Sequence, residues 1–402
     1  MPDPRSSETL RASLRDPALR HTTLAWAEGL RTPEGYRLWS GSPPHLLATC
    51  FAVFLRELLQ DLPAAGSREA AELSALLLAE RDGEDGLFQR NLASGGLGPR
   101  HDHAYVAEQQ THFALQSLRL LGRLEPAPPV LLERWSTRQG IHDAFSGLDW
   151  RDPWRESNRV MFALYLLEHE LARTGDPVFR ERIADGLDWL RETQDADTGC
   201  WGRDPGRRLY PAVYGAYHYL FFFLPWEGTM PGATRLLDVT RRLQTSEGFF
   251  AHTRGGGACE DYDCVDVLVK LGGEEDQGRL LRAAEAVWAA RNPDGGFPWA
   301  RPAAGALAFT LGNWKGGVSP RENLRLLVQR LRDVSRRERR WRYSGLAELD
   351  CPATASDLWS TWFRLLILAE IDDRWLRSGA RWGFRGFPSL GWHIHMESSC
   401  PS

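Results

Sequence analysis

The sequence has no run of 18 apolar residues, and its longest apolar block, residues 217–226, is only long enough for a buried helix. We therefore expect no membrane-spanning helix. The polar N-terminus carries no apolar signal segment, and the six cysteines form no closely spaced pair of the kind that binds zinc. These absences predict a cytoplasmic protein with reduced thiols and no structural zinc.

An excess of charge of one sign is also lacking. The chain has 49 Lys and Arg against 53 Asp and Glu, a formal net charge of −4, and its basic residues are spread along its length. A basic stripe that would bind nucleic acid is therefore not expected. Apolar residues make up 43% of the chain, which is ample for a core.

Aromatic residues, in contrast, are abundant. The chain has 17 Trp, 17 Phe and 9 Tyr, together 11% of its residues. Such residues can line a large apolar cavity, and they can equally fill the spaces between packed helices. Composition leaves both interpretations open.

A short signature returns about every fifty residues along most of the chain. It consists of an acidic or polar residue, a glycine and a large apolar residue, and its glycines are Gly35, Gly86, Gly140, Gly199, Gly248, Gly295 and Gly345. A period of this length indicates a repeated supersecondary unit. We expect each glycine to be the left-handed residue that follows a helix end.

Amphipathic segments rich in Arg, Glu and Leu precede most signatures, and more apolar, aromatic segments follow them. This alternation predicts an all-α fold, a single (α/α)6–7 toroid with outer and inner helices. The segment 304–313 is the weakest inner helix, because Gly305 and Gly312 interrupt it. Residues 1–380 should form the toroid, and the aromatic tail 381–402 should pack on it. The expected inner helices begin near Pro44, Val106, Asn158, Val213, Asp261, Ala304 and Asp357.

Three of the repeats carry a longer pattern. Gln194 precedes Gly199-Cys200-Trp201, Gln244 precedes Gly248-Phe249, and Asn292 precedes Asp294-Gly295-Gly296-Phe297. Over about residues 30–371 this pattern resembles the repeats of the α/α-toroid superfamily of terpene cyclases and protein prenyltransferases. The resemblance implies a toroid with a central cavity for an isoprenoid. Other α/α barrels of similar length, including sugar epimerases and polysaccharide lyases, remain alternatives.

The densest group of acidic residues is Glu260, Asp261, Asp263 and Asp266, which follows three glycines and opens an apolar segment. Acidic residues at a helix start are favoured by the helix dipole, and Asp261 could simply be the N-cap. Four carboxylates exceed what capping needs, however, and their mutual repulsion should raise at least one pKa. A protonated carboxylic acid in an apolar cavity can act as a general acid.

Asp261-Tyr262-Asp263-Cys264 resembles the Asp-x-Asp-Asp motif of class II terpene cyclases. In that family the middle Asp protonates an alkene or epoxide, a role that the resemblance implies for Asp263. Cys264 replaces the last Asp of the motif. The magnesium-binding motifs of class I synthases and the Asp-x-Cys spacing of the prenyltransferase zinc site are absent, so neither a metal nor another cofactor is expected.

The first turns of the inner helices should surround one mouth of a closed ring, so residues distant in sequence should converge there. His112 shares a helical face with Glu108 and could carry a proton near neutral pH, although a structural histidine fits equally well. The expected catalytic residues are Asp263, Asp261, Asp266 and His112. The expected substrate-binding residues are Glu108, Asn158, Tyr214, Tyr217, His218, Asp357 and Trp359.

The main functional prediction is an enzyme that uses acid-initiated chemistry on a small apolar substrate, isoprenoid by resemblance, as a cyclase or isomerase does. In a second interpretation the same carboxylates and His112 are the acid–base pair of a carbohydrate epimerase, lyase or hydrolase, and the many tryptophans stack on sugars. A third is a non-catalytic toroid that binds a lipid or a protein. The sequence does not indicate the oligomeric state.

Overall fold

The computed structural model describes residues 4–89, 97, 102–302, 305–313, 320–334 and 339–383. The predicted tail 381–402 lies outside these residues except for residues 381–383. None of the helices in these ranges is both long and apolar enough to cross a membrane.

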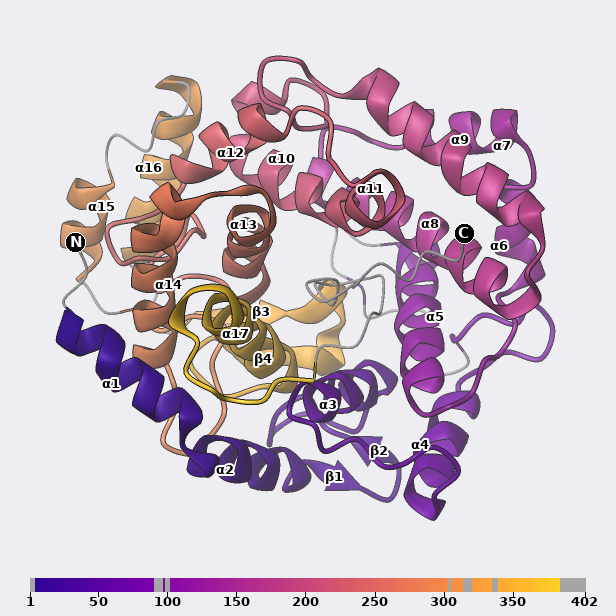
Figure 1. Ribbon diagram of the computed structural model, residues 1–402, viewed down its shortest axis with the longest axis horizontal. Coiled ribbons are helices and arrows are strands. Elements are labelled where there is room, and N and C mark those ends of the chain that lie inside the picture. Colours follow the sequence, from indigo (N-terminus) through magenta and orange to yellow (C-terminus); the bar gives the residue numbers. More distant parts are fainter. Residues whose placement is uncertain are drawn as a thin grey trace.

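Within the described ranges, six helices encircle the centre of the molecule (Figure 1). Each contacts the next along the chain, and the last contacts the first, which closes the ring. The predicted all-α toroid is confirmed. The inner helices are α3 (Leu46–Leu58), α5 (His103–Leu120), α8 (Pro153–Thr174), α10 (Leu209–Ala216), α13 (Ala258–Leu271) and α17 (Leu358–Ile371).

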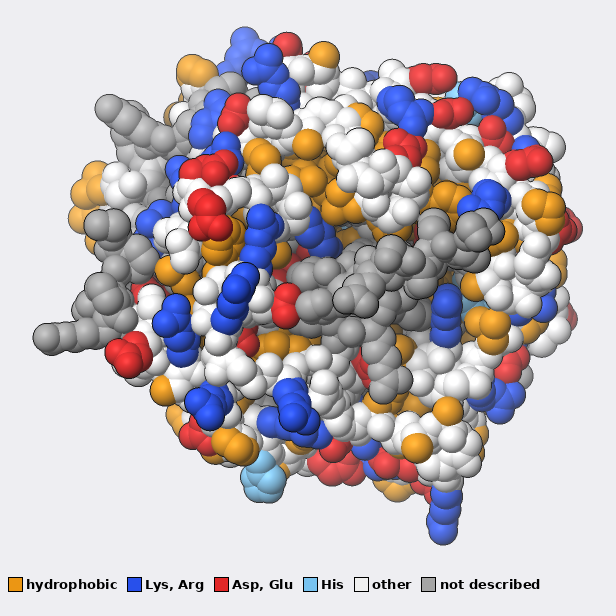
Figure 2. All heavy atoms as spheres, in the orientation of Figure 1, with side chains coloured by type: hydrophobic (Ala, Val, Ile, Leu, Met, Phe, Trp, Pro, Cys, Tyr) orange, Lys and Arg blue, Asp and Glu red, His pale blue; other side chains and the backbone are white. Residues whose placement is uncertain are grey.

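An outer layer of amphipathic helices surrounds this ring. In α9, for example, Ile183, Leu187 and Leu190 are buried at helical spacing against the inner helices. Figure 2 shows acidic and basic side chains interspersed on one face of the molecule. The outer helices are α1 (Pro4–Arg15), α2 (Pro17–Glu28), α4 (Arg68–Leu78), α6 (Pro129–Arg134), α7 (Arg138–Ser146), α9 (Pro177–Thr193), α12 (Ala233–Arg241) and α14 (Gln277–Ala289).

Short elements connect the two layers. Strands β1 (Arg31–Thr32) and β2 (Gly35–Tyr36) form one antiparallel hairpin, and β3 (Arg340–Arg342) and β4 (Asp350–Pro352) form another. After α10, the turn Tyr217–Tyr219 leads into α11 (Leu220–Glu227). The remaining helical turns are Pro205–Arg207, Glu274–Asp276, Tyr343–Gly345, Ala347–Leu349 and Asp372–Leu376.

The segment 304–313 is not an inner helix, contrary to the sequence prediction. Its helix α15 (Ala306–Gly312) contacts α16 (Pro320–Val334), and both lie outside the ring (Figure 1). Leu307 and Leu311 are 69% and 68% exposed. Six inner helices close the ring without α15, and glycines lie at both of its ends.

The repeated glycine has the predicted backbone conformation at six of its seven positions, where φ lies between 69° and 119°. These glycines do not end helices, however: α9 ends at Thr193, and Gly199 lies in the turn that follows. Gly140 was wrongly assigned to the repeat, because it lies inside α7. The signature therefore marks the turn between an outer helix and the next inner helix.

Hydrogen bonds explain why the turns contain glutamine. In the turn before α13, the Gly248 N–H donates to the Thr245 carbonyl at 3.0 Å. The Gln244 amide donates to the carbonyls of Gly248 at 3.0 Å and Arg279 at 2.9 Å, which ties the turn to the next outer helix. Gln194 makes the equivalent two bonds in the preceding unit.

A second bond ties four of these turns to an inner helix. The backbone N–H of the apolar residue after the glycine donates to a side chain on the inner helix packed against that turn. In three units the acceptor is a threonine hydroxyl: Thr49 at 3.1 Å, Thr111 at 3.1 Å and Thr361 at 2.9 Å. We call these residues the anchor threonines.

Candidate active site

A cavity of about 400 Å³ opens at the N-terminal ends of five inner helices, α5, α8, α10, α13 and α17. The β3–β4 hairpin and α16 contribute further wall residues. The cavity lies where the first turns of the inner helices were expected to converge. Four tryptophans and five tyrosines line it: Trp154, Trp299, Trp341, Trp359, Tyr105, Tyr210, Tyr214, Tyr217 and Tyr343.

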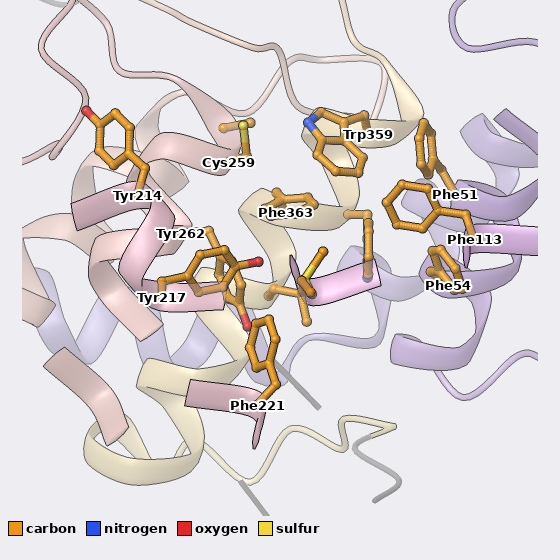
Figure 3. Packing of buried hydrophobic residues seen from close by; sticks show 14 of the residues in the cluster. Phe51, Phe54, Phe113, Tyr214, Tyr217, Phe221, Cys259, Tyr262, Trp359 and Phe363 are labelled. Atoms are coloured by element: carbon orange, nitrogen blue, oxygen red, sulfur yellow. The ribbon is translucent and has the colours of Figure 1, made fainter. Parts of the chain in front are cut away.

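The aromatic wall continues into the core of the ring. Figure 3 shows Trp359 and Phe363 of α17 between the phenylalanines of α3 and α5 on one side and Cys259 of α13 on the other. The ring centroids of Trp359 and Phe363 are 4.2 Å apart, and those of Trp359 and Phe51 are 4.8 Å apart. This dense packing holds the cavity-lining aromatic side chains in place from the core side of the wall.

The wall is also polar. Four arginines line the cavity, together with the amides of Gln109, Asn158 and Gln329. A site that guides carbocations should have few hydrogen-bonding groups, since these groups would quench the cation or retain water. The cavity is therefore unlike the apolar pocket that the sequence predicted for an isoprenoid. The arginines are Arg155, Arg208, Arg325 and Arg342.

Asp263 lies on the wall in the second turn of α13 and is only 1% exposed. Its Oδ2 atom has no hydrogen-bond partner among the described residues. Burial is the largest cause that raises the pKa of Asp263 well above its usual value, and the carboxyls of Glu260 and Asp266 raise the pKa further. Burial thus favours the protonated form of this side chain, and one of its oxygens has no hydrogen-bond partner in the described structure.

Glu260 lies one turn before Asp263 on the same face of α13 and also lines the cavity. Burial raises the pKa of its carboxyl from 4.5 to about 7, and Arg339 and Arg364 oppose this rise. Its Oε2 has no hydrogen-bond partner in the described part of the chain. A Cβ atom at Gly257 would lie 1.5 Å from Oε2, so only glycine leaves room for the carboxyl there.

Glu260 was not among the predicted site residues. The sequence signal that identifies it is its spacing of three residues from Asp263, which places both carboxyls on one helical face.

Asp261 points away from the cavity and takes the place of an anchor threonine. Its Oδ1 accepts from the N–H groups of Phe250 and Ala251, both at 2.7 Å. Its Oδ2 accepts from the Gly257 N–H at 2.9 Å and from Arg364 at 2.6 Å. These bonds attach the start of α13 to the preceding turn, so Asp261 positions Glu260 and Asp263 and does not itself reach the cavity.

Asp266 and His112 also lie outside the cavity wall. Asp266 forms a buried ion pair of 2.5 Å with Lys270, one turn further along α13. His112 shares a 3.0 Å hydrogen bond with Gln116 and contacts the Tyr165 ring. Burial is the main cause that lowers the pKa of His112 well below its usual value, so its imidazole is neutral.

Glu108 and Asp357 are likewise engaged elsewhere. Glu108 pairs with Arg134 at 2.9 Å. Asp357 caps α17 by accepting from the Ser360 N–H at 2.7 Å.

The remaining predicted binding residues, Asn158, Tyr214, Tyr217, His218 and Trp359, all line the cavity. The Tyr217 hydroxyl is buried and has no hydrogen-bond partner among the described residues. His218 shares a 2.8 Å hydrogen bond with Ser157, and burial lowers its pKa to about 3, so it is neutral. Across the described ranges, no three His, Cys, Asp or Glu side chains are placed to hold a metal ion.

No protein-family model and no curated relative matches the chain. Solved structures do match it. A polysaccharide lyase is 11% identical and has a TM-score of 0.45, and the match covers 92% of this chain and 98% of the lyase. A glycosidase is 14% identical with a TM-score of 0.46, and a glycosidase in complex with glucose is 13% identical with a TM-score of 0.47. Each of these two matches covers 90% of this chain and 97% of the glycosidase.

None of these three proteins is a terpene cyclase or a prenyltransferase, and the predicted membership in that superfamily is wrong. The physical reason lies in the site itself. Asp261 and Asp263 do not form one acid motif, since Asp261 is used by the anchor bonds, and the cavity wall carries arginines where an isoprenoid needs apolar surface. The prediction of isoprenoid chemistry is therefore also wrong.

Replacing Glu260 by Gln should change how stability depends on pH. The pKa of Glu260 is about 7 in the folded protein against 4.5 for a free carboxyl, so folding favours its protonated form. That stabilisation is fully present below the unfolded pKa and is lost as the pH rises through the folded pKa. Between about pH 5 and about pH 8, the free energy of unfolding of Glu260→Gln should rise by up to about 3 kcal/mol relative to that of the wild type.

Urea unfolding of both proteins at the two pH values measures this difference. Glu181→Gln, at a side chain that is 68% exposed, is the matched control and should show no such change. If the difference in free energy of unfolding between the wild type and Glu260→Gln does not change with pH, the raised pKa of Glu260 is contradicted.

Proposed function

We propose that the protein is a carbohydrate-active enzyme that hydrolyses a glycosidic bond in the central cavity. The observation that carries the proposal is the pair of unpartnered carboxyl oxygens, on Glu260 and Asp263, on one face of α13 at the cavity wall. Two neighbouring carboxyls that keep different protonation states supply the acid and the base of such a reaction.

Asp263, whose raised pKa favours its protonated form, donates its proton to the glycosidic oxygen as the bond between that oxygen and the anomeric carbon breaks. Glu260, ionised in a large fraction of molecules near neutral pH, accepts a proton from the water that attacks the anomeric carbon. The products are one free hydroxyl group and one new reducing end. Proton exchange with water then restores both carboxyls, so that atoms and charge balance.

The aromatic wall supports a sugar as the substrate. Trp299 and Trp341 stack with ring centroids 4.6 Å apart and both line the cavity, and flat indole surfaces suit the apolar faces of sugar rings. The amides of Gln109 and Asn158 are placed to bond sugar hydroxyls.

We also infer that residues 1–380 act as one domain. α1 contacts α14, and the Thr23 hydroxyl of α2 donates to the Gly295 carbonyl at 2.8 Å. The N-terminal helices thus complete the outer layer beside the last repeats.

Incubation of the full-length protein with a panel of oligosaccharides in ¹⁸O-labelled water tests the proposed function. We expect new reducing ends that carry one ¹⁸O atom at the anomeric carbon. An unsaturated sugar without ¹⁸O would show that the bond is broken by elimination and would replace hydrolysis by lyase chemistry. If no glycan in the panel is cleaved or bound, the proposed function is wrong.

A further inference from the structure

The charge of the cavity wall differs from that of the whole chain. The chain has a formal net charge of −4, whereas four arginines and three carboxyls line the cavity. Burial raises the pKa of two of these carboxyls, Glu260 and Asp263, and so favours their uncharged forms. The third is Asp152, so the wall carries net positive charge.

Two of the arginines already have acidic partners. Arg155 pairs with Asp102 at 2.5 Å, and Arg342 pairs with Asp350 at 3.3 Å. Their positive charge is therefore largely compensated by the protein.

Arg208 differs from these two. One guanidinium nitrogen, Nη1, donates to the backbone carbonyl of Arg151, and its Nε is buried without a hydrogen-bond partner in the described structure. Among the described residues, no carboxylate lies within ion-pair distance of it. The cavity thus holds an arginine whose charge the described protein groups leave uncompensated.

Arg208 lines the same cavity as the proposed acid, Asp263. Arg208 directly precedes α10, whose Tyr210 and Tyr214 line the same cavity, and α10 packs against α13, which carries Asp263. The N-terminal end of α10 also contributes the positive end of its dipole. A negatively charged group held here would lie in the same cavity as the bond that Asp263 protonates.

We propose that the substrate is a sugar with an anionic substituent and that Arg208 binds this oxyanion, either the carboxylate of a uronic acid or a sulfate ester. Both groups present two oxygens that a guanidinium can bind through two parallel hydrogen bonds. The inference rests on the proposed function, because it names the class of sugar that the same cavity takes.

Calorimetric titration of the full-length protein with three ligands tests the inference. The ligands are an oligosaccharide of a hexuronic acid, the same oligosaccharide with its carboxyls reduced to alcohols, and a sulfated neutral oligosaccharide. At least one charged ligand should bind about tenfold or more tightly than the reduced one. Tighter binding of the first ligand identifies a uronide, and tighter binding of the third identifies a sulfated sugar.

Variants at Arg208 assign the effect to this residue. Arg208→Gln should lower the affinity for the charged ligand to about that for the reduced one, whereas Arg208→Lys should keep part of the preference. Arg207→Gln, at a neighbouring side chain that is 63% exposed, is the matched control and should keep it in full. If Arg208→Gln does not fold, the salt dependence of wild-type binding tests the inference instead. The affinity for the charged ligand should fall more steeply with salt than the affinity for the reduced ligand.

The failures can be told apart. If the reduced oligosaccharide binds as tightly as both charged ones, or Arg208→Gln keeps the preference, the inference is wrong and the proposed function stands. If no oligosaccharide of any kind is bound or cleaved, the proposed function is wrong, and the inference falls with it.

Discussion

Asp263→Asn should lower kcat at least about 10²-fold and leave substrate affinity and the fold nearly unchanged. Asn keeps the shape of the side chain and removes the proton that the general acid donates. Asp263 is 1% exposed, and its Oδ2 has no partner in the described structure, so few protein contacts are lost. Steady-state kinetics on the glycan identified by the labelling experiment, with calorimetric binding alongside, measures the effect.

The matched control is a buried carboxyl that is not at the cavity. Burial raises the pKa of Glu168 on α8 to about 8, and its Oε1 accepts from the Trp226 indole. Glu168→Gln keeps that acceptor and should retain nearly full kcat. If Asp263→Asn keeps full activity, or if Glu168→Gln loses as much, the raised pKa of Asp263 reflects burial alone and the general-acid role is wrong.

The ring could be predicted from sequence because its cause is local and repeated. Each apolar segment must be buried on all sides and each amphipathic one on a single side, so alternation specifies two layers. The glycine signature was a less specific guide to the fold than the alternation of apolar and amphipathic segments. Gly140 fits the signature by residue type but lies within α7, where its φ is not positive.

The site was predictable only in part, because the acidic cluster contains two different functions. A side chain that anchors α13 to its turn was expected to be catalytic, since carboxylates suit both roles. Comparison between repeats separates them: Thr49 follows Gly35 at nearly the spacing at which Asp261 follows Gly248. Glu260 and Asp263 have no such structural explanation.

The cationic wall could not be predicted from sequence at all. Arg155, Arg208, Arg325 and Arg342 come from different elements, and their convergence depends on how the ring closes and on where α16 and the β3–β4 hairpin pack. No spacing between these arginines in the sequence predicts that they converge on one cavity. The family prediction was wrong because the sequence pattern shows the aromatic residues of this wall but not the arginines that converge on it.

The largest loss of stability should follow from breaking the pair of Asp261 and Arg364. Their ion pair of 2.6 Å is almost fully buried, with side-chain exposures of 2% and 0%. Asp261→Ala would leave a buried guanidinium without its carboxylate and remove the acceptor of three backbone N–H groups. We expect the free energy of unfolding to fall by about 3–5 kcal/mol, measured by urea unfolding followed through tryptophan fluorescence.

The anchor threonines suggest how this stability can be regained. Asp261→Thr combined with Arg364→Leu removes both charges and supplies the hydroxyl acceptor that Thr49 and Thr361 provide in other units. The double variant should be more stable than Asp261→Ala, because no uncompensated charge stays buried. Arg68→Ala, which breaks an ion pair at a side chain that is 93% exposed, is the control and should leave the free energy of unfolding nearly unchanged. A loss of under about 1 kcal/mol for Asp261→Ala would mean that α13 is held in place without this anchor, and Asp261 would then need another explanation.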